Sequence, residues 1–172
     1  MKKLLFLFAS AAFLLGINAV TAQKNSKNIV EIAASVDDFS TLVTALKAAD
    51  LVGALQGDGP FTVFAPVNAG FAKIDSDALN SLLQPQNKEE LSAILTYHVV
   101  AGKITAADVV NALKSGNGKA ELTTLNGAKL TAVQKDGGIF LMDQNGNYSK
   151  IAKTDVMASN GVIHIIEDVV MP

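Results

Sequence analysis

The sequence predicts a single domain of the α+β class, rich in helices in its first half and in strands in its second half. Apolar residues recur at helical spacing in the first half, and from Ala120 onward their period changes from 3.6 to 2. Asn-Gly and Asp-Gly pairs separate the later apolar runs, as they do in tight hairpins. Residues 23–172, about 150 residues, suit one domain with a core large enough to fold without disulfides.

The first 22 residues have the pattern of a secretory signal peptide. Lys2 and Lys3 form a charged start, and residues 4–17 form an apolar stretch of signal-peptide size. Val20 and Ala22 stand at the spacing that a signal peptidase needs. We therefore predict cleavage after Ala22.

Cleavage at this point would leave a short tail over 23–27 and a single domain over 28–172. No segment of this remainder approaches the roughly 20 apolar residues of a membrane-spanning helix, so we expect no membrane insertion of the mature chain. The chain has no cysteine that could carry a lipid anchor. The sequence therefore predicts a secreted or periplasmic protein.

The first predicted helix and the first predicted strand follow each other closely. In DDFSTLVTALKAADL the apolar residues share one helical face, and Asp37 or Asp38 is expected to cap the start of the helix. The run FTVFA lies between Pro60 and Pro66 and is rich in β-branched and aromatic residues. This composition is typical of a short buried strand.

Two further helices are predicted from their end signals. Asn87 and Glu90 form a capping-box pattern at the start of NKEELSAILTYHVV. Thr105 and Asp108 are expected to cap the helix in ITAADVVNALKSGNG, and Gly116 is expected to end it.

The strands of the second half are marked by turn residues. Hairpin turns are expected at Asn126-Gly127, Asp136-Gly137 and Asn145-Gly146, because these pairs tolerate the positive φ angles of tight turns. Asn160-Gly161 precedes a nearly continuous apolar run, VIHII. A strand without a polar face is usually buried on both sides.

Charge and composition argue against nucleic acid as a partner. The chain has 14 basic and 16 acidic residues, a net charge of −2, and every basic residue is lysine. Arginine is the usual residue for a bidentate contact with phosphate or guanine. An acidic chain without arginine is therefore expected to bind no nucleic acid.

Neither catalytic nor metal-binding motifs stand out, so we expect no catalytic residue, no metal and no cofactor. The two histidines, His98 and His164, lie in apolar runs and show no metal-ligand spacing. The sequence lacks a G-x-S-x-G nucleophile elbow and a glycine-rich phosphate loop. A hydrolytic triad needs no local motif, so a cryptic hydrolase stays as a third hypothesis.

Three segments together resemble the fasciclin-type domain family: GPFTVFAPVNAGF (59–71), ILTYHVVAG (94–102) and SNGVIHIIEDVVMP (159–172). Their order and spacing match the two boxes and the central Tyr-His motif of that family. The resemblance covers about residues 28–172. It implies a twisted β-sandwich or wedge with helices packed on one side.

The resemblance also suggests residues for partner binding. The Tyr-His motif of the family falls on Tyr97 and His98, and its Asp-Ile motif falls on Asp155 and Val156. Here valine replaces isoleucine, and Thr154 stands where proline often precedes the aspartate. These four residues are the candidate partner-binding residues.

Other residues of the same boxes are expected to have structural roles. Thr62 and Phe64 should lie in a core strand, and Pro66 should shape its exit, with Asn68 capping the next segment. Asn160 and Gly161 should form the turn before the last strand, which contains His164.

The leading functional hypothesis is a secreted, non-enzymatic binding module for adhesion. The family resemblance implies a cell-surface or matrix component as its partner, either a protein or a polysaccharide. The alternative is a periplasmic protein that binds a small ligand such as haem or a lipid in an apolar pocket. The oligomeric state is not predicted.

His98 decides between a chemical and a structural role for the central motif. It continues the apolar face of Leu91, Ile94 and Leu95, and no catalytic partner stands at motif spacing. We predict that His98 is buried and held by a hydrogen bond from a ring nitrogen, because buried polar groups need partners.

Overall fold

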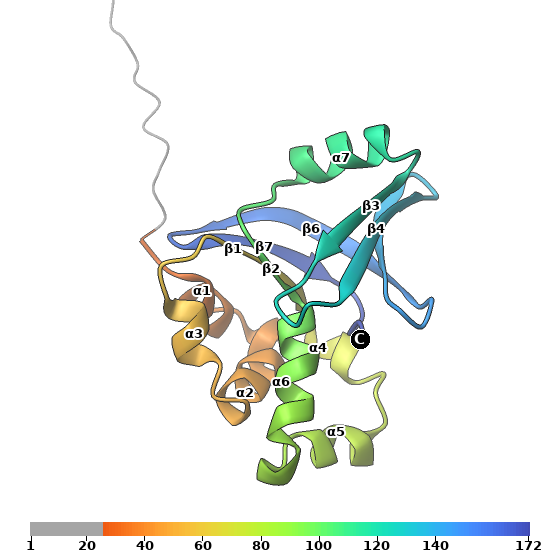
Figure 1. The fold of residues 1–172 in the computed structure, drawn as a ribbon. Coiled ribbons are helices and arrows are strands. Elements are labelled where there is room, and N and C mark those ends of the chain that lie inside the picture. The colour runs from red at the N-terminus through yellow and green to blue at the C-terminus, as the bar shows by residue number, and fades with distance from the viewer. Residues whose placement is uncertain (1–25) are drawn as a thin grey trace, which may run out of the picture.

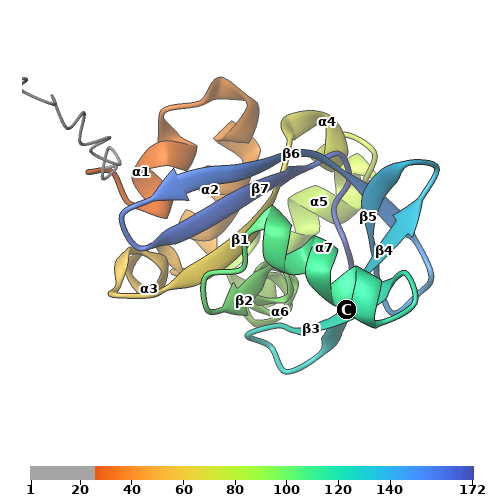
Figure 2. The ribbon, with the colours of Figure 1, turned by 90° about the horizontal axis from the view of Figure 1, so that it is seen from above.

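The computed structural model describes residues 26–172, in which helices pack against a curved seven-stranded sheet (Figure 1). The predicted signal peptide, residues 1–22, lies outside the described residues, as do residues 23–25. Six α-helices lie on one side of the sheet, and the seventh crosses its opposite side (Figures 1 and 2). The predicted α+β class is therefore confirmed, with the seventh helix as an exception to one-sided packing.

Three short helices and a 3₁₀ turn form the N-terminal part of the helical layer. They are α1 (Ile29–Ala34), the turn Asp37–Phe39, α2 (Ser40–Ala48) and α3 (Val52–Gln56). Asn28 caps α1 in a capping box with Glu31. The helix predicted in DDFSTLVTALKAADL is α2. The prediction that Asp37 or Asp38 caps it was wrong, because both residues lie inside the 3₁₀ turn and neither side chain caps α2.

Four helices follow the first strand. They are α4 (Asn68–Phe71), α5 (Ser76–Leu82), α6 (Lys88–Tyr97) and α7 (Ala106–Ser115). The Asn87–Glu90 capping box was wrong: the Asn87 amide donates hydrogen bonds to the Ser81 carbonyl and hydroxyl instead. The predicted capping box of Thr105 and Asp108 at α7 is confirmed.

Seven strands form the sheet in the order β2-β1-β7-β6-β5-β4-β3. Their bounds are β1 (Phe61–Pro66), β2 (Val99–Ala101), β3 (Lys119–Thr123), β4 (Lys129–Lys135), β5 (Gly138–Met142), β6 (Tyr148–Ala158) and β7 (Gly161–Ile166). Only the pairing of β1 with β7 is parallel. A bridge between Val100 and Thr124 joins the two ends of the order, so the sheet curls almost into a barrel.

The turns between strands follow their sequence signals at three of four places. Asp136 and Gly137 have φ angles of 50° and 76°, and Gly127 and Gly146 also have positive φ. Gly161 differs, since its φ is not positive. A Cβ there would lie 2.0 Å from the Phe61 carbonyl oxygen, so glycine is needed for the close approach of β7 to β1.

Strands β1 and β7 separate two apolar cores. Val63 and Ile163 face the helices α1–α6, whereas Phe64 and Ile166 face the interior of the curved sheet, which α7 covers. The predicted burial of the last strand on both faces is confirmed.

Candidate functional site

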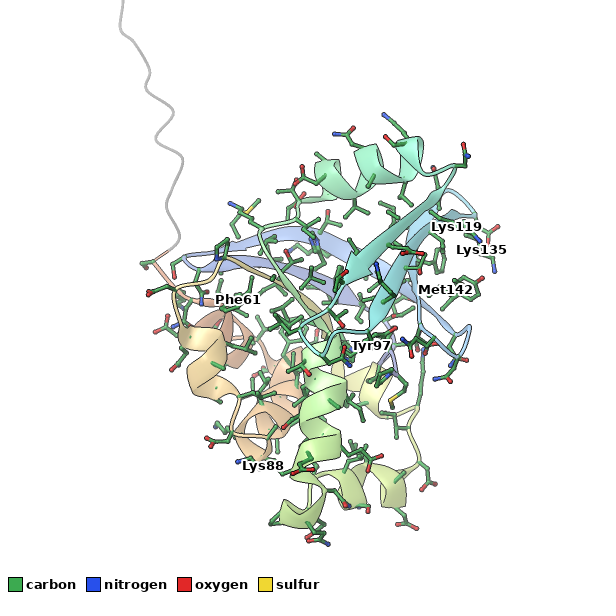
Figure 3. All side chains as sticks on the ribbon, viewed as in Figure 1. Phe61, Lys88, Tyr97, Lys119, Lys135 and Met142 are labelled. Atoms are coloured by element: carbon green, nitrogen blue, oxygen red, sulfur yellow. The ribbon has the colours of Figure 1, made fainter. Side chains whose placement is uncertain are left out.

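Tyr97 ends α6 inside the second core and has no exposed surface. Its hydroxyl donates a hydrogen bond to the Lys129 carbonyl oxygen at 2.8 Å, which attaches α6 to β4. Figure 3 labels Tyr97 at the end of α6. Burial raises the pKa of the phenol, and the negative charge of Asp143 raises it further. The buried side chain offers no contact surface and has a structural role here, so the partner-binding role of Tyr97 stays a prediction that its burial does not support.

His98 follows Tyr97 and is only 2% exposed. The Val170 N–H donates to Nε2 at 3.2 Å, so Nδ1 carries the proton and donates to the Ile94 carbonyl at 2.8 Å. Burial lowers the pKa of His98 to about 4, against a smaller opposite effect of the Ile94 hydrogen bond. The predicted burial and ring hydrogen bond are confirmed. The direct role of His98 in partner binding stays a prediction, which its burial does not support.

His164 is buried in β7, and its ring stacks on Phe64, with 5.5 Å between the ring centroids. Its Nε2 donates to the Ile104 carbonyl at 2.8 Å, and its Nδ1 accepts a hydrogen bond from the Asp155 N–H at 3.3 Å. His164 thereby joins the last strand to β6 and to the loop before α7. Both ring nitrogens are used by backbone groups, which leaves none to act on a substrate.

Asp155 lies at an irregularity of β6, where the register against β7 shifts and φ is 58°. Its Oδ1 accepts a hydrogen bond from the Ala106 N–H at 2.9 Å, so it adds a second cap to the start of α7. Val156 follows it, half-buried, and packs against the helical-side core. Asp155 and Val156 are therefore partly exposed, but Asp155 is hydrogen-bonded to α7 and Val156 is packed against the core.

Thr62, which lies in β1, binds the loop that precedes α7. Its hydroxyl donates to the Gly102 carbonyl at 2.7 Å and accepts a hydrogen bond from the Ile104 N–H at 2.8 Å. The structure thus brings Thr62, Asp155 and His164 together around residues 102–106, although the three are far apart in the sequence. Phe64 and Pro66 lie in the same strand and are buried, as expected.

Two asparagine side chains form hydrogen bonds with residues far away in the sequence, and sequence reasoning did not predict these bonds. Asn68 accepts a hydrogen bond from the Thr41 N–H at 3.0 Å, so it caps α2 rather than the following segment. This corrects the prediction for Asn68. Asn160 lies in the predicted turn before β7, accepts from the Ile29 N–H at 3.0 Å, and donates to the Leu55 and Gly57 carbonyls.

We call the polar side chains Thr62, His98, Asp155, Asn160 and His164 the motif network. Each of them binds backbone groups of a segment distant in sequence or at a helix end. No buried polar side-chain atom of the described residues lacks a hydrogen-bond partner. The motif network therefore holds segments together, and both of its histidine rings are bonded to backbone groups.

Asp143 is a buried carboxylate that the sequence reasoning passed over. It accepts hydrogen bonds from the Asn145 and Asn147 N–H groups, from the Asn147 side-chain amide, and from the Met171 N–H. Asp143 therefore fixes the β5–β6 turn and the C-terminal segment. The Asp-x-Asn-Gly pattern signals the turn, but nothing in the sequence signals the contact with Met171.

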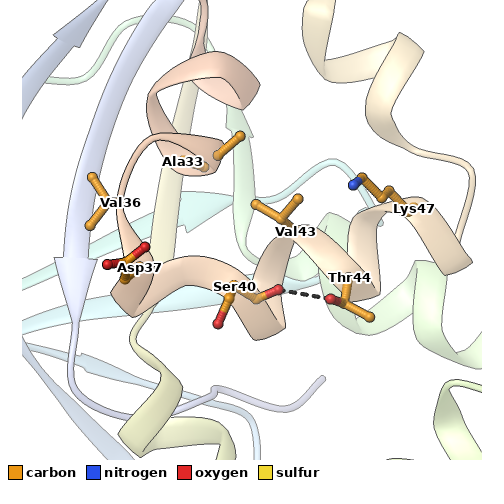
Figure 4. A pocket seen from close by; sticks show the side chains of 8 residues that line it. Ala33, Val36, Asp37, Ser40, Val43, Thr44 and Lys47 are labelled. Carbon is orange, nitrogen blue, oxygen red and sulfur yellow. Dashed lines mark hydrogen bonds between the residues drawn. The ribbon is translucent and has the colours of Figure 1, made fainter.

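Two of the open grooves on the surface of the described residues are large enough to consider as binding sites. One, of about 300 Å³, lies between α1 and α2 (Figure 4) and is lined by Ala33, Ala34, Val36, Asp37, Ser40, Val43, Thr44 and Lys47. The other, of about 390 Å³, is lined by Gly70, Lys73, Ile74, Asn147, Tyr148, Asp168, Val169 and Val170. Lys73 and Asp168 form an ion pair in the second groove.

Neither groove contains a histidine. Among residues 26–172 there is no cluster of three or more His, Cys, Asp or Glu side chains that could hold a metal ion. No helix within these residues has both the length and the apolar character to cross a bilayer.

A model of the fasciclin domain family matches residues 37–172, which is most of the chain. This chain belongs to the fasciclin domain family. The segments that suggested the resemblance form β1 with α4, the end of α6 with β2, and β7 with the C-terminal segment. The fasciclin fold therefore accounts for why these three segments meet.

Several relatives support the assignment. Protein sll1483 of Synechocystis sp. is 50% identical over 151 residues, which cover 88% of this chain and 77% of that protein. The immunogenic protein MPB70 of Mycobacterium bovis is 32% identical, over 88% of this chain and 73% of that protein. The transforming growth factor-beta-induced protein ig-h3 of Sus scrofa is 33% identical over 84% of this chain, which spans only 19% of that protein.

A solved structure shares the fold. It is a FAS1 domain pair from the insect cell adhesion molecule Fasciclin I, with a TM-score of 0.75 over 86% of this chain and 20% sequence identity. This chain spans about half of that structure, 52% of its length.

Proposed function

We propose that this fasciclin domain is a secreted, non-enzymatic adhesion module that binds a component of a cell surface or an extracellular matrix, either a protein or a polysaccharide. The observation that carries the proposal is the family match over residues 37–172. A relative of the same fold is described as a cell adhesion molecule. Adhesion modules act through surface contacts, so the function needs no catalytic residues.

The use of the titratable groups supports a binding role over catalysis. Both histidines are buried and bonded to backbone groups on both ring nitrogens. A general base must reach the proton of a substrate. For a hydrolase, replacing His98 or His164 by Gln would abolish an activity in a protein that remains folded, and circular dichroism would check the fold.

The proposal of export rests on the first 22 residues. Lys2, Lys3 and the apolar stretch 4–17 have the pattern of a signal peptide, with a cleavage site after Ala22. N-terminal sequencing of the protein from the periplasm or the medium tests this directly. We expect Gln23 as the first residue, and an intact Met1 would contradict export through cleavage.

The small-ligand alternative finds little support in the apolar core. The enclosed cavity between β1, β7 and the helices is lined by residues such as Leu42, Leu95 and Ile163, and it has room for about 10 Å³. Pockets for ligands of the size of haem hold roughly 300–1,000 Å³. An absorption spectrum and a native mass spectrum of freshly purified protein would reveal a retained ligand, and we expect neither a haem band nor added mass.

Attachment of cells tests the proposed function itself. A strain that lacks the gene is expected to attach less to its natural surface, and added purified protein should restore attachment. The immobilised protein should also retain a component of an envelope or matrix extract. Normal attachment of the deletion strain together with no retained component would refute an adhesive role.

A further inference from the structure

The outer face of strands β3–β6 carries rows of side chains that the pairing register defines. One row runs Lys119, Val133, Phe140, Lys150 across the four strands, and the next runs Glu121, Thr131, Met142, Tyr148. The inner face of the same strands is buried and includes Ala120, Leu130, Leu141 and Ser149. We call the outer side of these strands the lysine face.

The lysine face carries three exposed cations without carboxylate partners, although Val133, which lies in the row between two of them, is buried. Lys119, Lys135 and Lys150 are all exposed (Figure 3 labels Lys119 and Lys135), and no ion pair among residues 26–172 includes them. Lys129 is paired with Glu121 at 3.3 Å. Three ammonium groups are therefore left for a partner, on a chain whose net charge is negative.

Two acidic residues border this face. Asp136 lies in the β4–β5 turn beside Lys135, and Glu167 follows β7, where its N–H donates to the Lys150 carbonyl. Neither carboxylate forms an ion pair with the three lysines. Both lie at the border and not within the rows, where the one carboxylate, that of Glu121, is paired with Lys129.

Tyr148 links the lysine face to the groove of about 390 Å³. It is 45% exposed and is the one exposed aromatic side chain in the described part of the chain. The Lys135 ammonium lies 4.9 Å from the centre of its ring, and Tyr148 also lines the groove that contains the Lys73–Asp168 pair. An aromatic ring beside paired polar groups can stack on a sugar ring and bind its hydroxyl groups.

The spacing of the lysines distinguishes a polymer from a small anion. Lys119 and Lys150 stand three strands apart in one row, which corresponds to about 14 Å at an interstrand spacing of about 4.8 Å. This distance separates the two backbones, so a single carboxylate bridges both ammonium groups only where the two lysine side chains lean toward each other. A chain with regularly repeated negative charges can contact several of them at once.

From these observations we propose that the lysine face and the adjoining groove bind an acidic polysaccharide, such as a polymer of uronic acids. The lysines contact its carboxylates, and Tyr148 stacks on a sugar ring at the entrance of the groove. Lysine binds carboxylates and phosphates alike as a point charge, so the net negative charge of the chain is what argues against nucleic acid. This inference rests on the proposed adhesive function, for which it names the class of partner.

Affinity measurements on polygalacturonate test the inference, with dextran as the uncharged polymer. The protein should bind polygalacturonate but not dextran, and salt should weaken the binding because exposed charges are screened. The triple variant K119Q/K135Q/K150Q should bind about tenfold or more weakly, the sum of three exposed ion contacts. Tyr148→Ala should weaken binding about two- to tenfold, in keeping with loss of one aromatic contact.

A matched control removes the same charge elsewhere. The variant K47Q/K103Q/K114Q loses three exposed lysines outside strands β3–β6 and should bind polygalacturonate like the unchanged protein. Thermal denaturation should show that all variants are folded. Equal affinity of the two triple variants would overturn the inference, as would the absence of polygalacturonate binding at low salt.

Two further results separate the inference from its alternatives. Binding to anionic lipid vesicles or to DNA through the same three lysines, without binding to polygalacturonate, would also overturn it. If the protein retains an envelope component but does not bind polygalacturonate, the adhesive function is still supported. Only the inference that the partner is an acidic polysaccharide is then refuted.

Discussion

The motif network and the lysine face differ in how their polar groups are used. In the motif network, buried side chains such as Asn160 and His164 bind backbone groups of distant segments. On the lysine face, the exposed Lys119, Lys135 and Lys150 have no carboxylate partners within the described residues. The residues that identify the fasciclin family thus build the domain, and the partner contacts that we propose lie on a surface that the family motifs do not define.

This contrast sets the expected order of mutational effects. Changes in the motif network should cost stability, because each side chain there holds several backbone groups. Changes on the lysine face should cost binding and leave stability nearly unchanged, because exposed residues contribute little to the free energy of unfolding.

The largest effect is expected for Gly161→Ala, where β7 approaches β1. A Cβ at this position would meet the Phe61 carbonyl oxygen at 2.0 Å and the Ile29 side chain at 2.9 Å, and neither strand lies at an edge of the sheet. The clash should lower the free energy of unfolding by about 4 kcal/mol or more. Urea denaturation measures the change.

Gly53→Ala is the matched control for this substitution. Gly53 lies in α3, and a Cβ there would meet no atom within 4 Å. Alanine favours helix, so the variant should gain up to about 1 kcal/mol. A similar loss of stability in both glycine variants would show that the parallel pairing of β1 and β7 has no special steric limit.

Asn160→Ala should have the next largest effect. The substitution leaves the Ile29 N–H and the Leu55 and Gly57 carbonyls without their side-chain partner in a buried place. A loss of about 3 kcal/mol in the free energy of unfolding is expected, at the upper end for unsatisfied buried groups. Asn111→Ala on the exposed side of α7 serves as the control and should change stability by less than about 0.5 kcal/mol.

The stability of the protein should also depend on pH through His98. Its pKa is about 4 in the folded protein, below the ordinary value of 6.5, so the unfolded chain binds a proton at a higher pH than the folded chain does. The stabilisation is complete above about pH 6.5 and is lost as the pH falls toward 4, by about 3 kcal/mol in total. Urea denaturation at several pH values measures this slope.

A variant without the titrating ring isolates the contribution of His98. His98→Gln is less stable near neutral pH, but its stability should fall much less between pH 6.5 and 4. His164→Gln retains His98 and should therefore keep the steep dependence. If His98→Gln shows the same slope as the unchanged protein, the dependence belongs to other groups.

Sequence reasoning succeeded where the physical cause is local. The capping box of Thr105 and Asp108 joins residues three positions apart, and the Asp136-Gly137 turn needs only its own backbone angles. It failed at Asn87, where a local capping pattern competes with a contact to Ser81 across the preceding turn. A pattern of residue types does not show which of two nearby partners binds better.

Long-range contacts were beyond sequence reasoning. Asn68 caps a helix that begins 28 residues earlier, and Asn160 binds a backbone group 131 residues away. The lysine face belongs to the same class, because its rows appear only when the strand register is known. The burial of His98 was predictable because its own helix shows the apolar face that it continues.

The smallest effect on stability is expected for the variant K119Q/K135Q/K150Q, although it should have the largest effect on binding to polygalacturonate. Its lysines are exposed, and the one stabilising contact among them is that of Lys135 with the Tyr148 ring. The free energy of unfolding should change by less than about 1 kcal/mol. A large loss of stability would show that the lysines support the sheet itself, and the separation between a motif network that maintains the fold and a face that meets the partner would then fail.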